Sequence, residues 1–425
     1  PVDRSIDAYG NVLSTTNAKN QTSTNTYDAE TQSFVIQVTN PLGHSASSVY
    51  DPRSGAALST TDANGVTSST IYDPLGRSVK VVGPLDSEAL PTVQYEYDLS
   101  TLPMRTTVHA RIESGQAGVL TSYSFRDGLG REIQRRSPAE NGSQQTITGT
   151  VAFDSTGKII QQWVSYHEAA ATTYTAPTLS ALAAPYVYEY DAIGRLRKTT
   201  TPDGRVSTVD YNDRTVTATD ANGHQSRYVE DAFGRRTRVE EINGSEIYTT
   251  HFLYDDRDRL NQVMDALGNT TLISYDSLGR KLSMDDPDMG NWEYAYDDLG
   301  NLVQQTDARG VVTSFQYDDL NRTTLKSFTI PPAATEVAPT SPVSYVYDNP
   351  SLTYGVGRVA SVTDNSGTMV FDYDILGRLH SSTRTVDGTP YTFSRTYDLL
   401  GRPLTLTYPN AESVAYTYSP VGIQS

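Results

Sequence analysis

Aromatic and polar residues alternate along much of the chain. In Tyr294-Ala295-Tyr296 and Phe315-Gln316-Tyr317 an aromatic residue returns at every second position. A period of two places successive side chains on opposite faces of a strand. Asp, Asn, Gly and Pro interrupt these runs after about six or seven residues, a normal strand length. The longest helix-like stretch is the short Ala-rich segment 168–171. The pattern therefore predicts strands joined by tight turns, an all-β protein.

A repeat organises these predicted strands. The dipeptide Tyr-Asp recurs along the chain, and in its centre Tyr254, Tyr275, Tyr296 and Tyr317 are spaced 21 residues apart. A further Asp falls about midway in each interval, as Asp265 does between Tyr254 and Tyr275. Each repeat is therefore predicted to hold two strands and two turns, which makes it a β-hairpin. The predicted fold class is an array of stacked antiparallel β-hairpins of about 21 residues each, forming a curved, spiralling sheet in which each repeat is stabilised by its neighbours.

Two kinds of turn alternate. The signature turn follows Tyr and reads Asp-x-x-Gly-Arg; its Asp can accept backbone N–H bonds, and its Gly can adopt the left-handed conformation of a bulge. Asp258 and Asn321 replace this Gly in two repeats. Asp and Asn are the other residues that best tolerate positive φ, so backbone geometry explains the substitutions. The alternate turn uses the same Asp-to-Gly chemistry without the following Arg, as at Asp62, Asp220, Asp265 and Asp307.

The site residues that we predict are those of the structural repeat motif. They are Tyr72, Asp73, Gly76, Arg77, Tyr190, Asp191, Gly194, Arg195, Tyr275, Asp276, Gly279, Arg280, Tyr373, Asp374, Gly377, Arg378, Tyr397, Asp398, Gly401 and Arg402. Because every signature turn lies on the same edge of the sheet, that edge should carry a row of Arg paired with the turn Asp. The row comprises Arg77, Arg131, Arg195, Arg235, Arg259, Arg280, Arg322, Arg378 and Arg402.

Apolar residues are expected to form two rows. The aromatic residues of neighbouring hairpins should stack across strands on one face. The residue before each signature Gly should add a row near the edge: Leu75, Leu129, Ile193, Phe233, Leu278, Leu299, Leu376 and Leu400. A sheet of this kind has no compact centre.

We interpret residues 1–425 as one continuous array, most regular over 250–325. Segments rich in Pro, Ala, Ser and Thr near 83–90, 136–145, 174–185 and 328–342 are predicted to be loop insertions, because the period resumes after each of them. The chain begins Pro1-Val2-Asp3 without Met, which we interpret as a fragment or a processed product.

Composition excludes several classes of function. Lys and Arg number 33 against 50 Asp and Glu, a net charge of −17, so nucleic-acid binding is not expected. There is no cysteine and no long apolar run, which excludes disulfides, thiolate sites and a membrane-spanning helix. The six His are scattered, and hydrolase and phosphate-loop motifs are missing. We predict no catalytic residue, no cofactor and no metal site.

Three binding alternatives stay open. The row of Arg could be a site for an anionic ligand, although the net charge of −17 favours internal pairing of these Arg. The cluster Asp285-Asp286-Pro287-Asp288 could bind Ca²⁺, although Pro287 also suits an enlarged turn. The aromatic rows could form a sugar-binding platform, although their period of two favours contacts between strands.

The signature turns resemble those of the RHS, or YD-repeat, family, whose pattern is Tyr-Asp-x-x-Gly-Arg followed by a strand and a second Asp-containing turn. The resemblance runs from about Tyr27 to Tyr418. Seven segments keep the Asp, Gly and Arg of the pattern. A single copy would be a weak signal, whereas seven copies in register with a strand period are specific to the family. These segments end at Arg77, Arg131, Arg195, Arg235, Arg280, Arg378 and Arg402.

This resemblance implies a sheet that spirals into a hollow shell. Such shells enclose a C-terminal toxic domain in bacterial polymorphic toxins and in insecticidal toxin complexes, whereas the similar teneurins serve in cell adhesion. The acidic, cysteine-free repeats suit the toxin branch. The implied partners are other segments of the same parent shell, its C-terminal toxin cargo and a secretion or delivery machinery, and the implied location is secreted or at the bacterial cell surface.

Bacterial shells of this family usually end in a region with an Asp-Pro-containing motif, where an aspartyl autoprotease releases the toxin. No such region follows Arg402. We therefore expect a non-enzymatic segment of shell wall. The alternative is a cell-surface adhesion or carbohydrate-binding module built from YD repeats.

Overall fold

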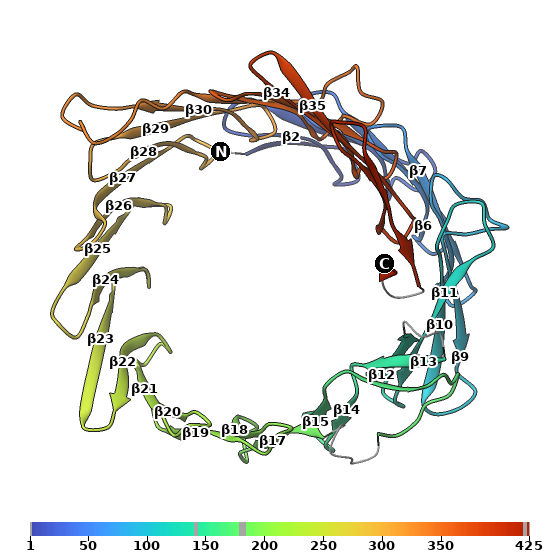
Figure 1. Cartoon of the computed structure of the whole chain (residues 1–425), viewed down its shortest axis with the longest axis horizontal. Helices are drawn as coiled ribbons and strands as arrows, with labels where there is room; N and C mark the ends of the chain where they lie inside the picture. The colour runs from blue at the N-terminus through green and yellow to red at the C-terminus, as the bar shows by residue number, and fades with distance from the viewer. Residues whose placement is uncertain (1, 140–142, 178–183, 420–422, 425) are drawn as a thin grey trace. The chain divides into compact units, whose positions relative to one another are not determined.

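The computed structural model describes residues 2–139, 143–177, 184–419 and 423–424. Throughout these residues the regular elements are strands, in agreement with the predicted all-β class (Figure 1). Nearly all of them belong to two long antiparallel sheets, in which almost every strand pairs with its neighbours in the sequence.

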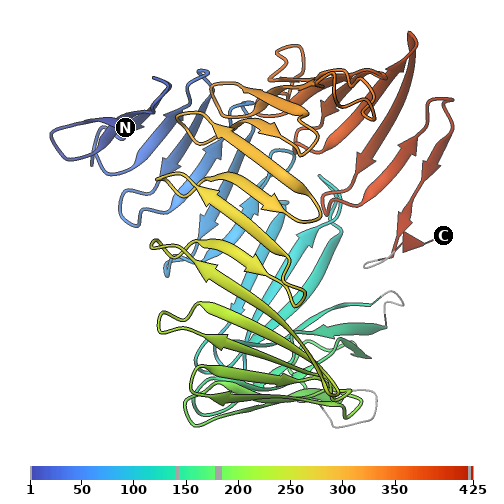
Figure 2. The same cartoon turned by 90° about the vertical axis from the view of Figure 1, so that its left-hand side faces the viewer.

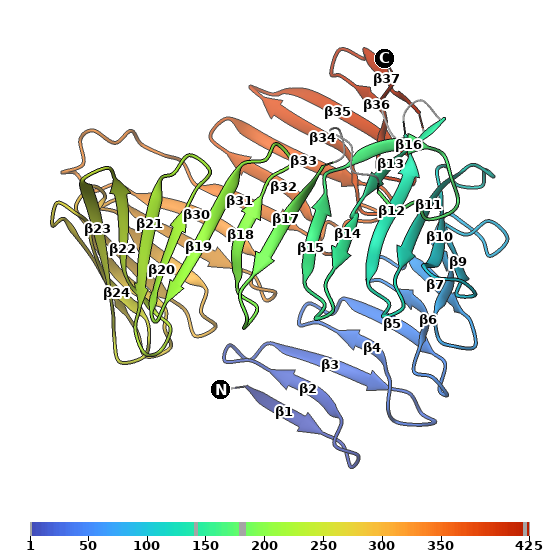
Figure 3. The ribbon, with the colours of Figure 1, turned by 90° about the horizontal axis from the view of Figure 1, so that it is seen from below.

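The first sheet has 14 strands in the order β1 to β13 followed by β16. Figure 3 shows β1 to β5 following one another along this sheet. Its strands are β1 (Asp3–Ile6), β2 (Val12–Thr16), β3 (Thr22–Tyr27), β4 (Val35–Thr39), β5 (Ser45–Tyr50), β6 (Ala57–Thr61), β7 (Thr67–Tyr72), β8 (Ser78–Val82), β9 (Val93–Asp98), β10 (Met104–Arg111), β11 (Val119–Arg126), β12 (Glu132–Pro138), β13 (Gln144–Thr148) and β16 (Tyr166–Ala169).

The second sheet has 23 strands in the order β14, β15 and then β17 to β37, and Figure 2 shows its central hairpins stacked in chain order. Its strands are β14 (Val151–Phe153), β15 (Ile159–Trp163), β17 (Pro185–Tyr190), β18 (Leu196–Thr200), β19 (Val206–Asn212), β20 (Thr215–Thr219), β21 (Gln225–Glu230), β22 (Arg236–Asn243), β23 (Glu246–Tyr254), β24 (Leu260–Met264), β25 (Thr270–Tyr275), β26 (Lys281–Asp286), β27 (Gly290–Tyr296), β28 (Leu302–Thr306), β29 (Val312–Tyr317), β30 (Thr323–Thr329), β31 (Val343–Tyr347), β32 (Val359–Asp364), β33 (Gly367–Tyr373), β34 (Leu379–Val386), β35 (Thr389–Tyr397), β36 (Pro403–Thr407) and β37 (Ser413–Ala415). A separate pair is formed by β38 (Thr417–Tyr418) and β39 (Ile423–Gln424).

The chain divides into two compact units. The first unit comprises Pro1–Glu96, Thr107–Thr121 and Ala295–Ser425, and the second comprises Tyr97–Thr106 and Ser122–Tyr294. The first unit thus brings together two stretches of repeats that lie far apart in the sequence.

The signature turns build the hairpins as their sequence predicts. In the turn between β25 and β26, Gly279 has φ of 85°, and the strand register shifts between Ser274 and Tyr275. This is the combination of a left-handed residue and a bulge that closes such a hairpin. Asp258 and Asn321, which replace the Gly elsewhere, have φ of 63° and 62°. The prediction of positive φ at these two residues is confirmed.

The predicted loop insertions agree with the structure to different extents. Residues 83–90 lie in the connection between β8 and β9. The predicted insertion 328–342 begins too early, because its first two residues end β30, and residues 330–342 connect β30 to β31. The segment 136–145 differs from the prediction, because its first three residues end β12 and its last two begin β13, so that Pro138 pairs with Gln145 in a hairpin. Parts of 136–145 and 174–185 lie outside the described residues. The single array over 1–425 stays a prediction.

Buried side chains are few and concentrated. Among the residues that the structure describes, the buried apolar side chains are Phe125, Ala139, Ile147, Trp163, Val216, Val311 and Ala360. Four of these seven lie between residues 125 and 163, where the first sheet ends and the second begins. There the fully buried Arg136 donates to the Glu168 carboxylate at 2.7 Å and to Gln134 at 3.0 Å. Elsewhere each hairpin depends on the strands beside it rather than on a common core.

Candidate functional site: the edge of signature turns

The Asp of a signature turn fixes the turn with both of its carboxylate oxygens. In the repeat that follows β23, Oδ1 of Asp255 accepts the backbone N–H groups of Arg257 and Arg259 at 2.9 and 3.0 Å. Oδ2 accepts the Nε–H of Arg259 at 2.7 Å. The Asp255 N–H donates to the Arg259 carbonyl at 2.9 Å, which closes the turn. One carboxylate therefore orders the turn backbone and the Arg that leaves it.

The predicted Arg–Asp pairing is confirmed at every position of the row. Each Arg lies within 2.5–2.7 Å of the Asp four residues before it. The pairs are Arg77–Asp73, Arg131–Asp127, Arg195–Asp191, Arg235–Asp231, Arg259–Asp255, Arg280–Asp276, Arg322–Asp318, Arg378–Asp374 and Arg402–Asp398. Each of these turns follows a strand that ends at or next to the signature Tyr position, so all of them lie on the same edge of the ribbon.

The same Arg also reaches the next repeat, a contact that sequence reasoning missed. The guanidinium carbon of Arg259 lies 4.9 Å from the ring centre of Tyr275, and its Nη1 donates to the Asp276 carbonyl at 2.6 Å. Further Arg–aromatic contacts of 4.0–5.6 Å join Arg131 to Phe153, Arg195 to Tyr211, Arg235 to Tyr254, Arg322 to Tyr347, Arg358 to Tyr373, Arg378 to Tyr397 and Arg402 to Tyr418.

The Tyr hydroxyl completes the link between repeats. Tyr275 donates its O–H to the carbonyl of Leu260, the first residue of β24, at 2.8 Å. The acceptor lies 15 residues earlier, directly after the preceding signature turn. The same bond, at 2.5–3.3 Å, is made by Tyr27, Tyr72, Tyr190, Tyr211, Tyr254, Tyr317, Tyr347, Tyr373, Tyr397 and Tyr418.

These contacts correct the expected stacking of aromatic rings. Signature Tyr residues of neighbouring repeats are two strands apart, about 9.5 Å, beyond the 4.5–7 Å of ring–ring contact. Arg fills the interval instead. Ring pairs do occur at other positions, as between Phe34 and Tyr50 at 5.2 Å.

Hydrogen bonds lower the pKa of some turn carboxylates, among them Asp255 and Asp73. The side chain of Arg259 and then the turn N–H groups lower the pKa of Asp255 to about 2, although burial acts against them. At Asp73 the backbone N–H of Arg77 is the largest cause of a lowered pKa. A proton-transfer role near neutral pH would need a raised carboxylate pKa, so these Asp residues suit structure rather than acid–base chemistry.

The predicted apolar row near the edge divides into two environments. Leu75, Leu129, Ile193, Phe233 and Leu278 are 74–79% exposed at the tips of their turns. Leu299, Leu376 and Leu400 occupy the same turn position and are half-buried. The half-buried residues all lie in the first unit, in its stretch after residue 295.

Alternate turns cover part of the signature edge in the first unit. Lys19 pairs with the turn carboxylate of Asp297 at 2.6 Å, and Gln21 donates to Asp319 at 2.9 Å. Asn64 exchanges two hydrogen bonds with the backbone of Val356, at 2.9 and 3.1 Å. We call this line of contacts the seam; Figure 1 shows β2 beside β28 to β30 where it begins.

The partners across the seam advance together along the sequence. As one side proceeds from Lys19 to Asn64, the other proceeds from Asp297 to Val356. Farther on, the Leu399 N–H donates to the Ile112 carbonyl at 2.9 Å. The side-chain contacts join residues that are 278–298 positions apart. Two lengths of repeats therefore lie side by side and run in the same direction within the first unit.

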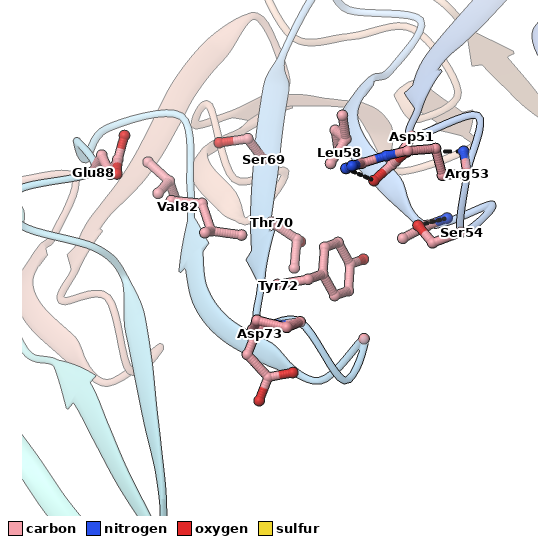
Figure 4. A pocket seen from close by; sticks show the side chains of 14 residues that line it. Asp51, Arg53, Ser54, Leu58, Ser69, Thr70, Tyr72, Asp73, Val82 and Glu88 are labelled. Carbon is pink, nitrogen blue, oxygen red and sulfur yellow. Dashed lines mark hydrogen bonds and ion pairs between the residues drawn. The ribbon is translucent and has the colours of Figure 1, made fainter.

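A pocket of about 840 Å³ lies between the signature turns after β5 and β7 (Figure 4). The Asp51–Arg53 pair stands on one side, Glu88 on the other, and Tyr72 between them. The Arg53 side chain is 89% exposed, so the pocket offers charged groups to solvent.

No three His, Asp or Glu side chains of the described residues gather where they could hold a metal ion. In the cluster 285–288, Asp286 accepts the N–H groups of Asp288 and Met289 at 3.0 Å and the Thr271 hydroxyl at 2.7 Å. These contacts give the enlarged turn that Pro287 suggested. Within the described ranges, no helix has the length and apolarity needed to cross a bilayer.

Comparison with known proteins adds to this geometry. The family model for the RHS repeat matches residues 190–225 and 296–327, which include the repeats at Tyr190 and Tyr317. These two segments of the chain are RHS repeats. No curated protein matches its sequence.

Several solved structures share the fold of this chain over nearly all of its length. A TcdB2–TccC3 chain superposes with a TM-score of 0.84 at 19% identity, covering 99% of this chain and 26% of that one. TcdB2–TccC3 without its hypervariable C-terminal region gives 0.84 at 16% identity, covering 100% and 28%. The Photorhabdus luminescens Tc holotoxin pore with a TccC3 mutation gives 0.83 at 16% identity, covering 99% and 28%. The chain thus spans about a quarter of the length of the chains it matches.

Proposed function

We propose that this chain is a non-enzymatic segment of the wall of a secreted bacterial RHS toxin, and that in the longer protein the wall encloses a C-terminal toxic polypeptide. The observation that carries this proposal is the superposition of 99% of the chain on TcdB2–TccC3. Other segments of the same shell, the enclosed cargo and a delivery machinery would be its partners.

The chemistry of the repeat supports a structural role. Its conspicuous polar groups, the turn Asp and Arg, are used in hydrogen bonds and ion pairs within and between repeats. A wall built this way needs no common core, since each hairpin is held by the edge contacts of the next. Its inner face can then surround a space instead of filling it.

Limited proteolysis of the longer parent protein tests the proposal. The parent would be digested under native conditions beside a control in which the C-terminal region is expressed without the repeats. We expect the C-terminal fragment to survive in the parent and to be degraded in the control. Equal degradation in both samples would contradict enclosure.

The pocket between Asp51 and Glu88 favours a second candidate, a carbohydrate-binding module. An aromatic ring beside exposed carboxylate and guanidinium groups can bind a sugar by stacking and hydrogen bonding. A glycan array probed with this chain and with Arg53→Ala tests it. The candidate predicts binding that Arg53→Ala weakens, and a blank array excludes it.

A further inference from the structure

Four buried hydrogen-bonding groups lie in the second unit, where the first sheet ends and the second begins. They are Nη1 of Arg136, Oγ1 of Thr150, Nε1 of Trp163 and the hydroxyl of Tyr166, and none has a hydrogen-bond partner among the described residues. Arg136 is fully buried, and Thr150 and Trp163 are 1% and 8% exposed. Buried polar groups without partners are costly and uncommon in folded proteins, so such a cluster marks a place where a ligand can bind.

The strand register places Arg136 and Tyr166 on one face of the first sheet. Figure 3 shows β12, β13 and β16 side by side. Across these strands Arg136 pairs with Ile147, and Ile147 pairs with Tyr166, so the three side chains share a face. The Arg136 guanidinium extends past Ile147 to reach Glu168 on β16. Its charge is therefore delivered to the strand that carries Tyr166.

Thr150 and Trp163 approach Tyr166 from the start of the second sheet. The Trp163 N–H donates to the Thr150 carbonyl at 2.9 Å, and the adjoining residues Val151 and Gln162 pair in register, so Thr150 and Trp163 stand opposite each other. Burial raises the pKa of Tyr166, and the Thr150 hydroxyl acts against burial, which places that hydroxyl near the phenol. The two hydroxyls do not bond each other, and both remain available to a ligand between them.

These groups suit a ligand that accepts hydrogen bonds. Arg Nη1 and Trp Nε1 can only donate, and both hydroxyls can donate as well. The other nitrogens of Arg136 are occupied, since Nε donates to Gln134 at 3.0 Å and Nη2 to Glu168 at 2.7 Å. The Glu168 side chain is 27% exposed, so water screens its carboxylate, whereas the guanidinium lies wholly inside. The inner end of Arg136 therefore still attracts a second anion.

Enclosure restricts the size and the charge of that anion. All four atoms are closed to solvent, so the ligand must give up its hydration shell. For a dianion this loss is much larger, and one guanidinium shared with Glu168 would not offset it. A halide ion carries a single charge and accepts hydrogen bonds from any direction.

We propose that Arg136, Thr150, Trp163 and Tyr166 bind a halide ion. The bound ion links β12 and β16 of the first sheet to β15 of the second, and so stabilises the corner at which one sheet gives way to the other. The site depends on no part of the proposed function and is independent of any enclosed cargo.

The fluorescence of Trp163 tests the site. The chain has two Trp, so in Trp292→Phe the emission comes from Trp163 alone. Trp292 donates its Nε1–H to the Met289 carbonyl and lies outside the site. Bromide would be titrated at constant ionic strength, with sulfate as the balancing salt. We expect the emission to fall and to saturate, since a heavy ion held beside the indole quenches it, and we expect chloride to reverse the fall.

Variants that each lack one hydroxyl identify the binding groups. Thr150→Val and Tyr166→Phe, made in the Trp292→Phe chain, keep nearly the same volume and should each weaken bromide binding about tenfold. The control Tyr188→Phe removes a hydroxyl on β17 that donates to Gln162 at 3.0 Å, and should bind bromide like the parent. Circular dichroism checks that the variants keep their strands. Both variants binding as tightly as the control would overturn the proposal.

Hydrogen exchange of the natural chain provides a measurement that needs no substitution. Bromide should slow exchange in β13, β15 and β16, with the concentration dependence seen in fluorescence, and sulfate at equal ionic strength should not. Occupation of the site by water alone predicts no change of Trp163 emission with bromide. That result, a fall in emission that never saturates, or equal protection by the two salts would contradict a halide site.

Discussion

Two successive signature turns show how one sequence motif can serve two environments. The turn after β25 reads Asp276-Ser277-Leu278-Gly279-Arg280 and extends Leu278 into solvent. The turn after β27 reads Asp297-Asp298-Leu299-Gly300-Asn301, and its Leu299 is half-buried beside the seam. Both Asp residues order their turns in the same way, through N–H bonds at the second and fourth following residues.

The difference between these turns lies in what covers them. At Asp276 the cation is Arg280 of the same turn, at 2.5 Å. At Asp297 the equivalent residue is Asn301, and the cation comes from Lys19 on another length of the chain. The bonds within the turn are therefore the same, while at Asp297 the cation comes from another length of repeats and joins it to this turn.

Acid is expected to have the largest effect, because it acts on covered and uncovered turns together. The pKa values of Asp255 and Asp297 are lowered to about 2, against about 3.9 in an unfolded chain. A lowered pKa stabilises the fold above the unfolded value and loses that contribution as the pH falls toward the folded value. The urea midpoint should stay level above about pH 5 and drop between about pH 4 and pH 2. A midpoint that is constant down to pH 2 would contradict this account.

A charge at the turn tip should separate the two environments. Leu299→Asp places a carboxylate in the half-buried tip next to Asp297, and should destabilise the hairpin by about 2–3 kcal/mol. Leu278→Asp, at a tip that solvent already surrounds, should change stability by less than about 0.5 kcal/mol. Hydrogen exchange of each hairpin measures the effect locally, since repeat proteins need not unfold as one unit. Equal effects at the two sites would remove the distinction.

Loss of the Tyr hydroxyl should have the same effect in both regions. Tyr275→Phe and Tyr317→Phe each remove a hydrogen bond, of 2.8 and 2.7 Å, to the carbonyl of the preceding repeat. Each should destabilise its hairpin by about 1 kcal/mol, because the bond belongs to the ribbon and not to the seam. Hydrogen exchange of each hairpin, measured over a series of denaturant concentrations, provides the measurement. The control is Tyr391→Phe, because Tyr391 on β35 has an exposed ring.

The smallest effect is expected for the cation of the seam. Lys19→Met removes the ion pair with Asp297 and keeps a similar unbranched side chain. Its loss should destabilise the hairpin after β27 by about 0.2–1 kcal/mol, and by less at high salt, as for other accessible ion pairs. The same exchange measurement at Leu278 serves as the control and should not change.

Most of the turn could be predicted because its determinants lie within six residues. Asp, Gly and Arg at fixed spacing specify the carboxylate bonds, the positive φ and the ion pair, and positive φ at Asn321 followed from the same chemistry. The contact of Arg with the Tyr of the next repeat was missed because it depends on the distance between alternate strands. The constant spacing between residues such as Arg259 and Tyr275 could have indicated it.

The seam could not be predicted from the repeats. Lys19 and Asp297 lie 278 residues apart, and neither differs in type from residues at uncovered turns. Which turns meet depends on the accumulated twist of many strands, a property that no short segment encodes. The buried cluster at Arg136 likewise joins residues from strands whose order changes between the two sheets.

Cross-linking across the seam tests most directly whether separate lengths of this ribbon join edge to edge. The chain contains no cysteine, so Asn64→Cys/Val356→Cys would carry its only two thiols. We predict that a short bifunctional thiol reagent links the two residues within one monomer, which a shift in gel mobility and peptide mass analysis would show, while each single-cysteine chain gives no internal link. A native, folded double-cysteine monomer that remains unlinked would contradict the account.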